Sequence, residues 1–174
     1  MPSSGSTAGP SSVAWIDPVA ASPLLPSAVA DGDLPIHHMP GHHIRRLQQV
    51  AVELFARTLA AVDITPVQYA VLSALAKHRA IPQATVSALI GYDRATIGGV
   101  IDRLEAKSWL RRRRDPSDRR VWRLELTPAG RKVLRTVTPQ VERVQESLLA
   151  PLDDVERRDF ERLCLKLLRH HDAS

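Results

Sequence analysis

The 174-residue sequence predicts a mainly α-helical chain with one small β-hairpin. Three observations support this fold class. From Ile44 onward, apolar residues recur at three- and four-residue spacing, the period of helices that bury one face. Hydrophobic residues make up 44% of the chain but aromatic ones only 4%, so aliphatic side chains, mostly Leu, Val and Ala, must build the core. Residues 110–126 break the helical period and instead predict two short strands around a polar turn.

The first 40 residues differ in composition from the rest. They are rich in Pro, Ser and Ala, and they hold seven of the thirteen prolines. Such a segment buries too little apolar area to offset the entropy of ordering it. Residues 1–40 are therefore predicted to be a largely disordered tail.

Two helices are predicted to follow the tail. Leu47 to Val62 carries one apolar stripe and predicts a long first helix. The second begins with Thr65 as cap and Pro66 at the first helical position, and Gln68 can close a capping box.

Two shorter helices come next. One runs from about Gln83 to Ile90 and ends at Gly91, and Asp93 caps the helix after it. That later helix carries a core stripe of Ile97, Val100, Ile101 and Leu104. Two helices joined by a tight turn with glycine form a helix-turn-helix.

The predicted hairpin concentrates positive charge. Leu110–Arg114 pairs with Val121–Leu126 across a four-residue turn, residues 115–118. Between Trp109 and Arg123 lie seven arginines, Arg123 included, and two acids, a local charge of +5 that equals the net charge of the whole chain. A rigid basic hairpin beside a helix-turn-helix favours duplex DNA as the partner, although such a run can also be a solvated surface without a ligand.

Two more helices are predicted after the hairpin. Thr127-Pro128 repeats the cap-then-proline signature and opens a long helix that Pro151 ends. The last helix carries Val155, Leu163, Leu167 and Leu168, with the single cysteine, Cys164, beside them. This spacing favours a buried, inert thiol over a redox switch.

A winged helix-turn-helix reads DNA with short polar or cationic side chains near the start of its second helix and with the hairpin, its wing. Glycines cost about 1 kcal/mol each inside a helix relative to alanine, so the pair after Ile97 indicates either close approach to the groove or a crowded helix contact. Arg103 suits a phosphate, or is merely solvated. Asp118 shapes the wing turn or orients an arginine. The predicted DNA-binding residues are Asp93, Arg94, Thr96, Gly98, Gly99, Arg103, Arg113, Arg114, Asp118, Arg119 and Arg120.

Four segments carry a resemblance to a known family: Asp93 to Thr96, Val100 to Leu110, Asp115 to Arg120, and Leu126 to Gly130. In this order they resemble the MarR family of transcriptional regulators. The resemblance covers roughly residues 40–170. Ser108 departs from it, since many members have glycine there. The helix around Gly98 and Gly99 and the His-rich entry to the first helix are also similar to members that regulate nicotinate catabolism and respond to a hydroxylated nicotinic acid.

The resemblance implies how the chain is organised and what it does. Residues 65–126 would form the DNA-binding domain, and residues 41–64 and 127–172 would supply interlocking helices of a homodimer. The dimer would bind a double-stranded pseudo-palindrome, most often as a repressor. No cofactor is expected, but a small aromatic acid would act as effector.

Four histidines, at positions 37, 38, 42 and 43, are expected just before the first helix. With the following arginines they suit the carboxylate of an aromatic acid; zinc binding and a polar helix entrance without a ligand remain alternatives. The second helix should pass the first, which brings in two more candidates. The predicted effector-binding residues are His38, His42, His43, Arg46, Gln68 and Tyr69.

Other function classes lack their signatures. The sequence has no Gly-rich phosphate loop, nucleophile elbow or metal-hydrolase spacing, so it does not predict an enzyme. The single cysteine and the absence of a long apolar run indicate a soluble cytoplasmic protein without membrane contacts. A metal-responsive regulator and a ligand-independent architectural DNA-binding protein remain the alternatives.

Overall fold

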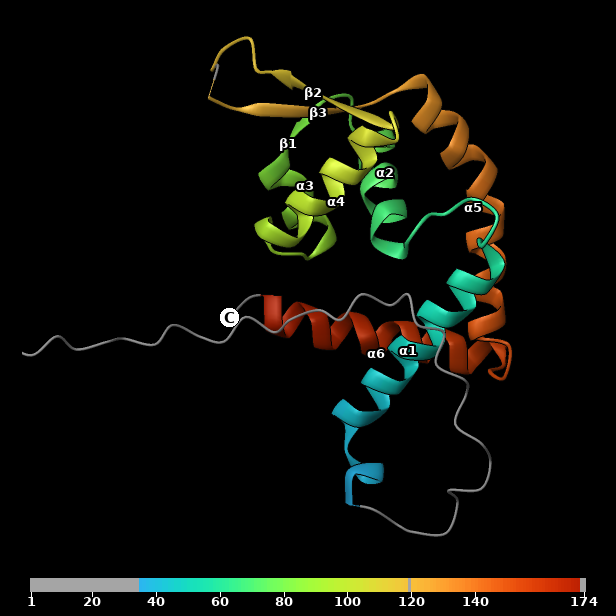
Figure 1. Cartoon of the computed structure of the whole chain (residues 1–174). Coiled ribbons are helices and arrows are strands. Elements are labelled where there is room, and N and C mark those ends of the chain that lie inside the picture. The colour runs from blue at the N-terminus through green and yellow to red at the C-terminus, as the bar shows by residue number, and fades with distance from the viewer. Residues whose placement is uncertain (1–34, 119, 173–174) are drawn as a thin grey trace, which may run out of the picture.

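The computed structural model describes residues 35–118 and 120–172, and it confirms the predicted fold class. A 3₁₀ helix, Pro35–His38, precedes six α-helices and three short strands (Figure 1). In chain order these are α1 (Pro40–Thr58), α2 (Pro66–Lys77), β1 (Ile81–Pro82), α3 (Gln83–Ile90), α4 (Arg94–Ala106), β2 (Leu110–Arg114), β3 (Trp122–Leu126), α5 (Pro128–Leu148) and α6 (Asp154–Asp172). The tail predicted over residues 1–40 lies outside the described residues up to position 34.

The long helix α5 connects two parts of the molecule. At its start lie the sheet and α2, α3 and α4; at its other end lie α1 and α6 (Figure 1). α5 packs against both α1 and α2. No helix in the described part of the chain is long and apolar enough to cross a membrane.

The predicted helix signals are confirmed. Thr65 and Gln68 close a reciprocal capping box at the start of α2, in which each side chain accepts a hydrogen bond from the other's backbone N–H. Gly91 ends α3 at φ 70°, and the side chain of Asp93 caps α4. Thr127 caps α5 by accepting the N–H of Gly130 at 3.0 Å.

The start of the first helix was predicted too late. α1 begins at Pro40, because a proline is well suited to the first helical position. His42 and His43 therefore lie in the first turn of α1, whereas His37 and His38 belong to the preceding 3₁₀ helix. The histidines do not form one segment before the helix, as the sequence had predicted.

The sheet contains one strand that the sequence did not predict. β2 and β3 pair antiparallel as expected, from Leu110 opposite Leu126 to Arg114 opposite Trp122. β1 adds to the other edge of β3, with Ile81 opposite Leu124. Two residues that include a proline show no alternation, so no sequence pattern marks this strand.

The start of α5 is in close backbone contact with the connection between α4 and β2. Ser108 has φ 58°, a left-handed conformation that glycine adopts more easily than serine. Gly130 packs so tightly that a Cβ placed there would lie 2.0 Å from the carbonyl oxygen of Trp109. Only glycine fits this position without a backbone shift.

The helix α6 has no buried residue. Its apolar side chains, among them Phe160, Leu163, Leu167 and Leu168, are exposed. Cys164 is half-exposed, so the predicted burial of this thiol is wrong for the single chain, because its face of α6 is uncovered.

Candidate nucleic-acid interface

Helix α4 is held by one face and leaves the other open. Ile97, Val100, Ile101 and Leu104 are buried in the core. Arg94, Gly99 and Arg103 are exposed. Neither arginine forms an ion pair with a residue that the structure describes. α4 therefore presents Arg94 and Arg103 on either side of an exposed surface that has no side chain at Gly99.

Two of the predicted DNA-binding residues are engaged with each other. Asp93 accepts hydrogen bonds from the backbone N–H of Thr96 at 2.9 Å and from its hydroxyl. The hydroxyl contributes most to lowering the pKa of Asp93. Both side chains serve the cap of α4, so any contact with a base must share these groups.

The two glycines of α4 are not required by the packing of the chain. A Cβ at Gly98 would meet only the side-chain nitrogen of Gln83, at 3.7 Å, which is an ordinary contact. A Cβ at Gly99 would have no neighbour within 4 Å, and neither glycine has a positive φ. The crowded helix contact considered above is absent within the described chain, which favours the other explanation, close approach to a groove.

In the wing, acidic side chains neutralise part of the arginine run. Arg112, on the face of β2 toward α4, pairs with Glu105 at 2.5 Å and also with Asp102. On the opposite face Glu125 pairs with Arg111 at 2.7 Å and with Arg113 at 3.2 Å. Arg112 thus joins the wing to α4, and one carboxylate serves both Arg111 and Arg113.

Two further arginines of the run, Arg114 and Arg120, are exposed toward the tip of the wing. The guanidinium of Arg114 stacks on the ring of Trp122, 3.9 Å from its centroid, and Trp122 is itself 41% exposed. Arg120 is exposed and forms no ion pair with the residues described. Arg119 lies outside the described residues. Asp118 accepts the backbone N–H of Arg120 at 2.9 Å, in keeping with its predicted role in shaping the turn.

The sequence assigned no role to Asp115, the first residue of the turn. Its carboxylate is buried, with 5% of the residue exposed, and accepts hydrogen bonds from the turn and from Arg123. The Ser117 hydroxyl and N–H, followed by Arg123, hold its pKa far below the usual range. An acid at the start of a four-residue turn was the available signal, since Asp commonly accepts the N–H two residues on.

The predicted effector-binding residues fall into two groups. In the first, His43 bonds through Nε2 to the carbonyl of His37 at 2.6 Å, and the ring of His42 lies 5.8 Å from that of His37. Burial and the charges of Arg45, His37, Arg46 and His43 lower the pKa of His42. His38 belongs to the same group by position.

The second group lies on α2. Tyr69 packs against Phe55, with 6.4 Å between ring centroids. Gln68 is buried, and its carbonyl oxygen already closes the capping box. His42 lies 13 residues before Phe55 on α1, about 20 Å along a helix. One chain therefore does not bring the two groups together.

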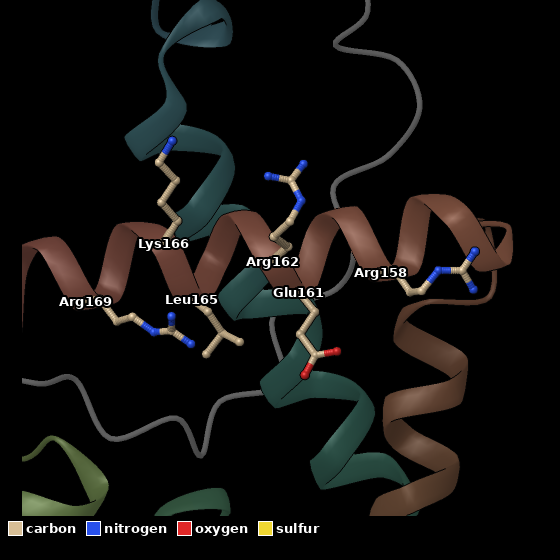
Figure 2. A pocket seen from close by; sticks show the side chains of 6 residues that line it. All are labelled: Arg158, Glu161, Arg162, Leu165, Lys166 and Arg169. Carbon is tan, nitrogen blue, oxygen red and sulfur yellow. The ribbon is translucent and has the colours of Figure 1, made fainter.

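A shallow, open pocket of about 460 Å³ lies on the surface of α6 (Figure 2). It contains none of the predicted effector-binding residues. Its walls are Arg158, Glu161, Arg162, Leu165, Lys166 and Arg169, all from one helix. In the described part of the chain, no group of three or more His, Cys, Asp or Glu side chains is arranged to hold a metal ion.

Comparison with known proteins identifies what this arrangement is similar to. The model of the MarR family matches residues 64–122, from the end of the α1–α2 connection to the start of β3. The HTH-type transcriptional repressor NicR of Pseudomonas putida is 31% identical over 117 residues, which are 67% of this chain and 74% of NicR.

Two solved structures have the same fold over nearly their whole length. BpsR of Bordetella bronchiseptica, whose DNA binding is regulated by 6-hydroxynicotinic acid, has a TM-score of 0.74 and 33% identity, covering 78% of this chain and 97% of BpsR. A cysteine-to-serine variant of MarR from E. coli, solved in complex with operator DNA, has a TM-score of 0.72 and 26% identity, covering 79% of this chain and 99% of that one.

Proposed function

Because this chain belongs to the MarR family of transcriptional regulators, we propose that it represses transcription as a homodimer bound to a pseudo-palindromic operator. The observation that carries this proposal is the distribution of charge. The base of the wing is neutralised by acids, whereas the wing tip and both sides of α4 keep exposed arginines. Cations at these places suit the phosphates on either side of a groove that α4 enters.

The uncovered apolar side chains support the homodimer. Exposed apolar residues gather on α6 and on the first half of α1, where Ile44 and Leu47 are exposed. These are the helices that interlock in the dimer implied by the family. A second copy that covered them would set two α4 helices about 10 base pairs apart.

Binding to DNA tests this part of the proposal. The dimer should shift a duplex containing its own promoter, and with 6–10 phosphate contacts the affinity should fall by about 10³–10⁵ between 50 and 200 mM salt. Arg120→Gln should weaken binding to all sequences alike, whereas Arg94→Ala should relax preference at particular base pairs. A chain that ignored double-stranded DNA at low salt would not be a repressor of this kind.

For the effector we propose an aromatic carboxylate, with a hydroxylated nicotinic acid as the leading candidate. The support is the group of histidines and arginines at the start of α1, together with the similarity to BpsR. An arginine can bind the carboxylate, while a neutral imidazole such as His42, whose pKa is lowered, can hydrogen-bond a ring substituent.

Thermal-shift and DNA-release measurements test the effector. 6-Hydroxynicotinate, nicotinate and hydroxybenzoates would each be titrated against the protein–operator complex. The expected result is a saturable rise in melting temperature and release of DNA with at least one of them. His42→Ala should abolish the response, and His171→Ala, at the far end of α6, should keep it. A response unchanged in His42→Ala would contradict the proposed site.

A further inference from the structure

The turn of the wing is built around a buried negative charge. Oδ1 of Asp115 accepts hydrogen bonds from the N–H of Ser117 at 2.7 Å, from its hydroxyl at 2.6 Å and from the N–H of Asp118 at 3.3 Å. Oδ2 accepts the Nε–H of Arg123. Both oxygens are thus used inside the protein, and the residue is 5% exposed, so this carboxylate has little surface to offer a ligand.

Arg123 extends these contacts to the body of the domain. A second nitrogen of its guanidinium, Nη1, donates to the carbonyl of Ala80 at 3.1 Å. Ala80 directly precedes β1, and β1 leads without a break into α3. The arginine therefore ties the wing turn to the segment that opens the helix-turn-helix, across a sheet in which Pro82 lies opposite Arg123.

The same contacts continue to the tip. Asp118, whose N–H is held by Asp115, accepts the N–H of Arg120. Hydrogen bonds therefore run from the carbonyl of Ala80 through Arg123, Asp115 and Asp118 to the backbone of Arg120. The exposed side chain of Arg120 starts from a backbone position that this network fixes relative to α3.

We propose that Asp115 and Arg123 are positioning residues for DNA binding, which hold the wing tip in the geometry that lets Arg120 reach the phosphate backbone. The proposal rests on the DNA-binding function proposed above. It assigns Arg123, one of the seven arginines of the run, to contacts with Asp115 and Ala80 within the protein rather than to DNA.

This role reverses what charge alone predicts. Asp115→Asn removes a negative charge from a surface that binds a polyanion, so electrostatics alone predicts tighter binding. If the network positions the tip, the same substitution must weaken binding, because a neutral amide loses the ion pair with Arg123. Glu125→Gln is the matched control. It removes one negative charge from the same hairpin, but it releases Arg111 and Arg113 and leaves the turn intact.

The test compares operator affinity and its salt dependence in the full-length protein and the two variants. Asp115→Asn should bind about tenfold or more weakly, and its slope of log affinity against log salt should become shallower by about 2 per dimer, one lost contact per wing. Glu125→Gln should bind as tightly as wild type or more so. Arg123→Lys keeps the charge but replaces the two guanidinium nitrogens that contact Asp115 and Ala80 with one compact ammonium group, and it should resemble Asp115→Asn.

Stability and stoichiometry separate this role from simple damage. Circular dichroism and titration of the active fraction would show whether Asp115→Asn stays folded, and a variant that merely unfolds in part keeps the wild-type salt slope in its active fraction. If wild type binds its operator and Asp115→Asn binds equally or more tightly, the positioning role is wrong while the proposed function stands. If wild type itself fails to bind, the proposed function is wrong.

Discussion

The winged part of the chain, residues 64–126, and the helices that flank it differ in whether their apolar side chains are buried. Of the seventeen buried hydrophobic residues in the described part, twelve lie between Ile64 and Leu126. α6, with nineteen residues, contributes none. The winged part buries its apolar side chains within one chain, whereas α6 and the first half of α1 leave apolar side chains exposed in the single chain.

Polar groups follow the same division. The winged part pairs several of its charged groups between different segments of the chain, such as Arg112 with Glu105 and Arg123 with Asp115. On α6 the described ion pair joins Arg162 to Asp159 of the same helix, both largely exposed. The winged part is therefore held together by contacts within one chain, whereas the apolar face of α6 is left uncovered in the single chain. This contrast teaches that substitutions in the two regions should affect different measurements.

The largest effect is expected where the flanking helices lack a cover. Leu163→Glu combined with Leu167→Glu places two charges on the apolar face of α6 and should give a monomer. Losing the linkage between two DNA-binding domains should weaken operator binding by about 10²–10⁴-fold, while a half-site is bound as before. Light scattering and binding to whole and half operators would measure this.

Leu165→Glu is the control for that pair. Leu165 is also an exposed leucine of α6, but it lies among the arginines that line the pocket in Figure 2. The Leu165→Glu variant should therefore remain a dimer. A double variant that stayed dimeric would refute the assignment of the apolar face to self-association.

The next largest effect is expected where the two regions join. Gly130→Ala brings a Cβ within 2.0 Å of the Trp109 carbonyl oxygen, so the start of α5 or the backbone of Trp109, just before β2, must move. Overpacking of this kind should lower the free energy of unfolding by about 3 kcal/mol. Thermal melting at fixed dimer concentration would measure it, and a melting temperature equal to wild type would show that the junction is softer than its packing indicates.

A smaller effect of opposite sign is expected on the open face of α4. Gly99→Ala meets no atom within 4 Å and should raise stability by about 1 kcal/mol through helix propensity. If the glycine is there to let the helix approach DNA, the same variant should bind its operator more weakly. A variant that gained stability and kept full affinity would show that Gly99 is not needed for the approach of α4 to DNA.

The parts of the structure that could be predicted from the sequence are those that depend on local contacts. Caps and apolar stripes are local, so Thr65, Asp93 and Thr127 marked their helices correctly. β1 and the buried role of Asp115 depend on residues distant in the chain, such as Leu124 and Arg123, and local pattern does not encode these contacts. The count of charges treated the wing arginines as equivalent, whereas in the structure they differ in the acidic residues with which they form ion pairs.

The smallest effect is expected at the left-handed residue that ends α4. The N–H of Ser108 bonds to the carbonyl of Glu105 at 2.8 Å and that of Trp109 to Leu104 at 2.9 Å, the pattern of a helix end that favours glycine. The left-handed backbone conformation costs a non-glycine residue about 1–2 kcal/mol, and glycine avoids this cost. Glycine in turn destabilises the folded protein by about 0.4–1 kcal/mol, because it raises the conformational entropy of the unfolded chain. Ser108→Gly should therefore stabilise the winged part by about 0.5–1 kcal/mol, measurable by urea unfolding, without changing dimerisation. Loss of stability instead would mean that the serine side chain makes a contact worth more than the backbone strain.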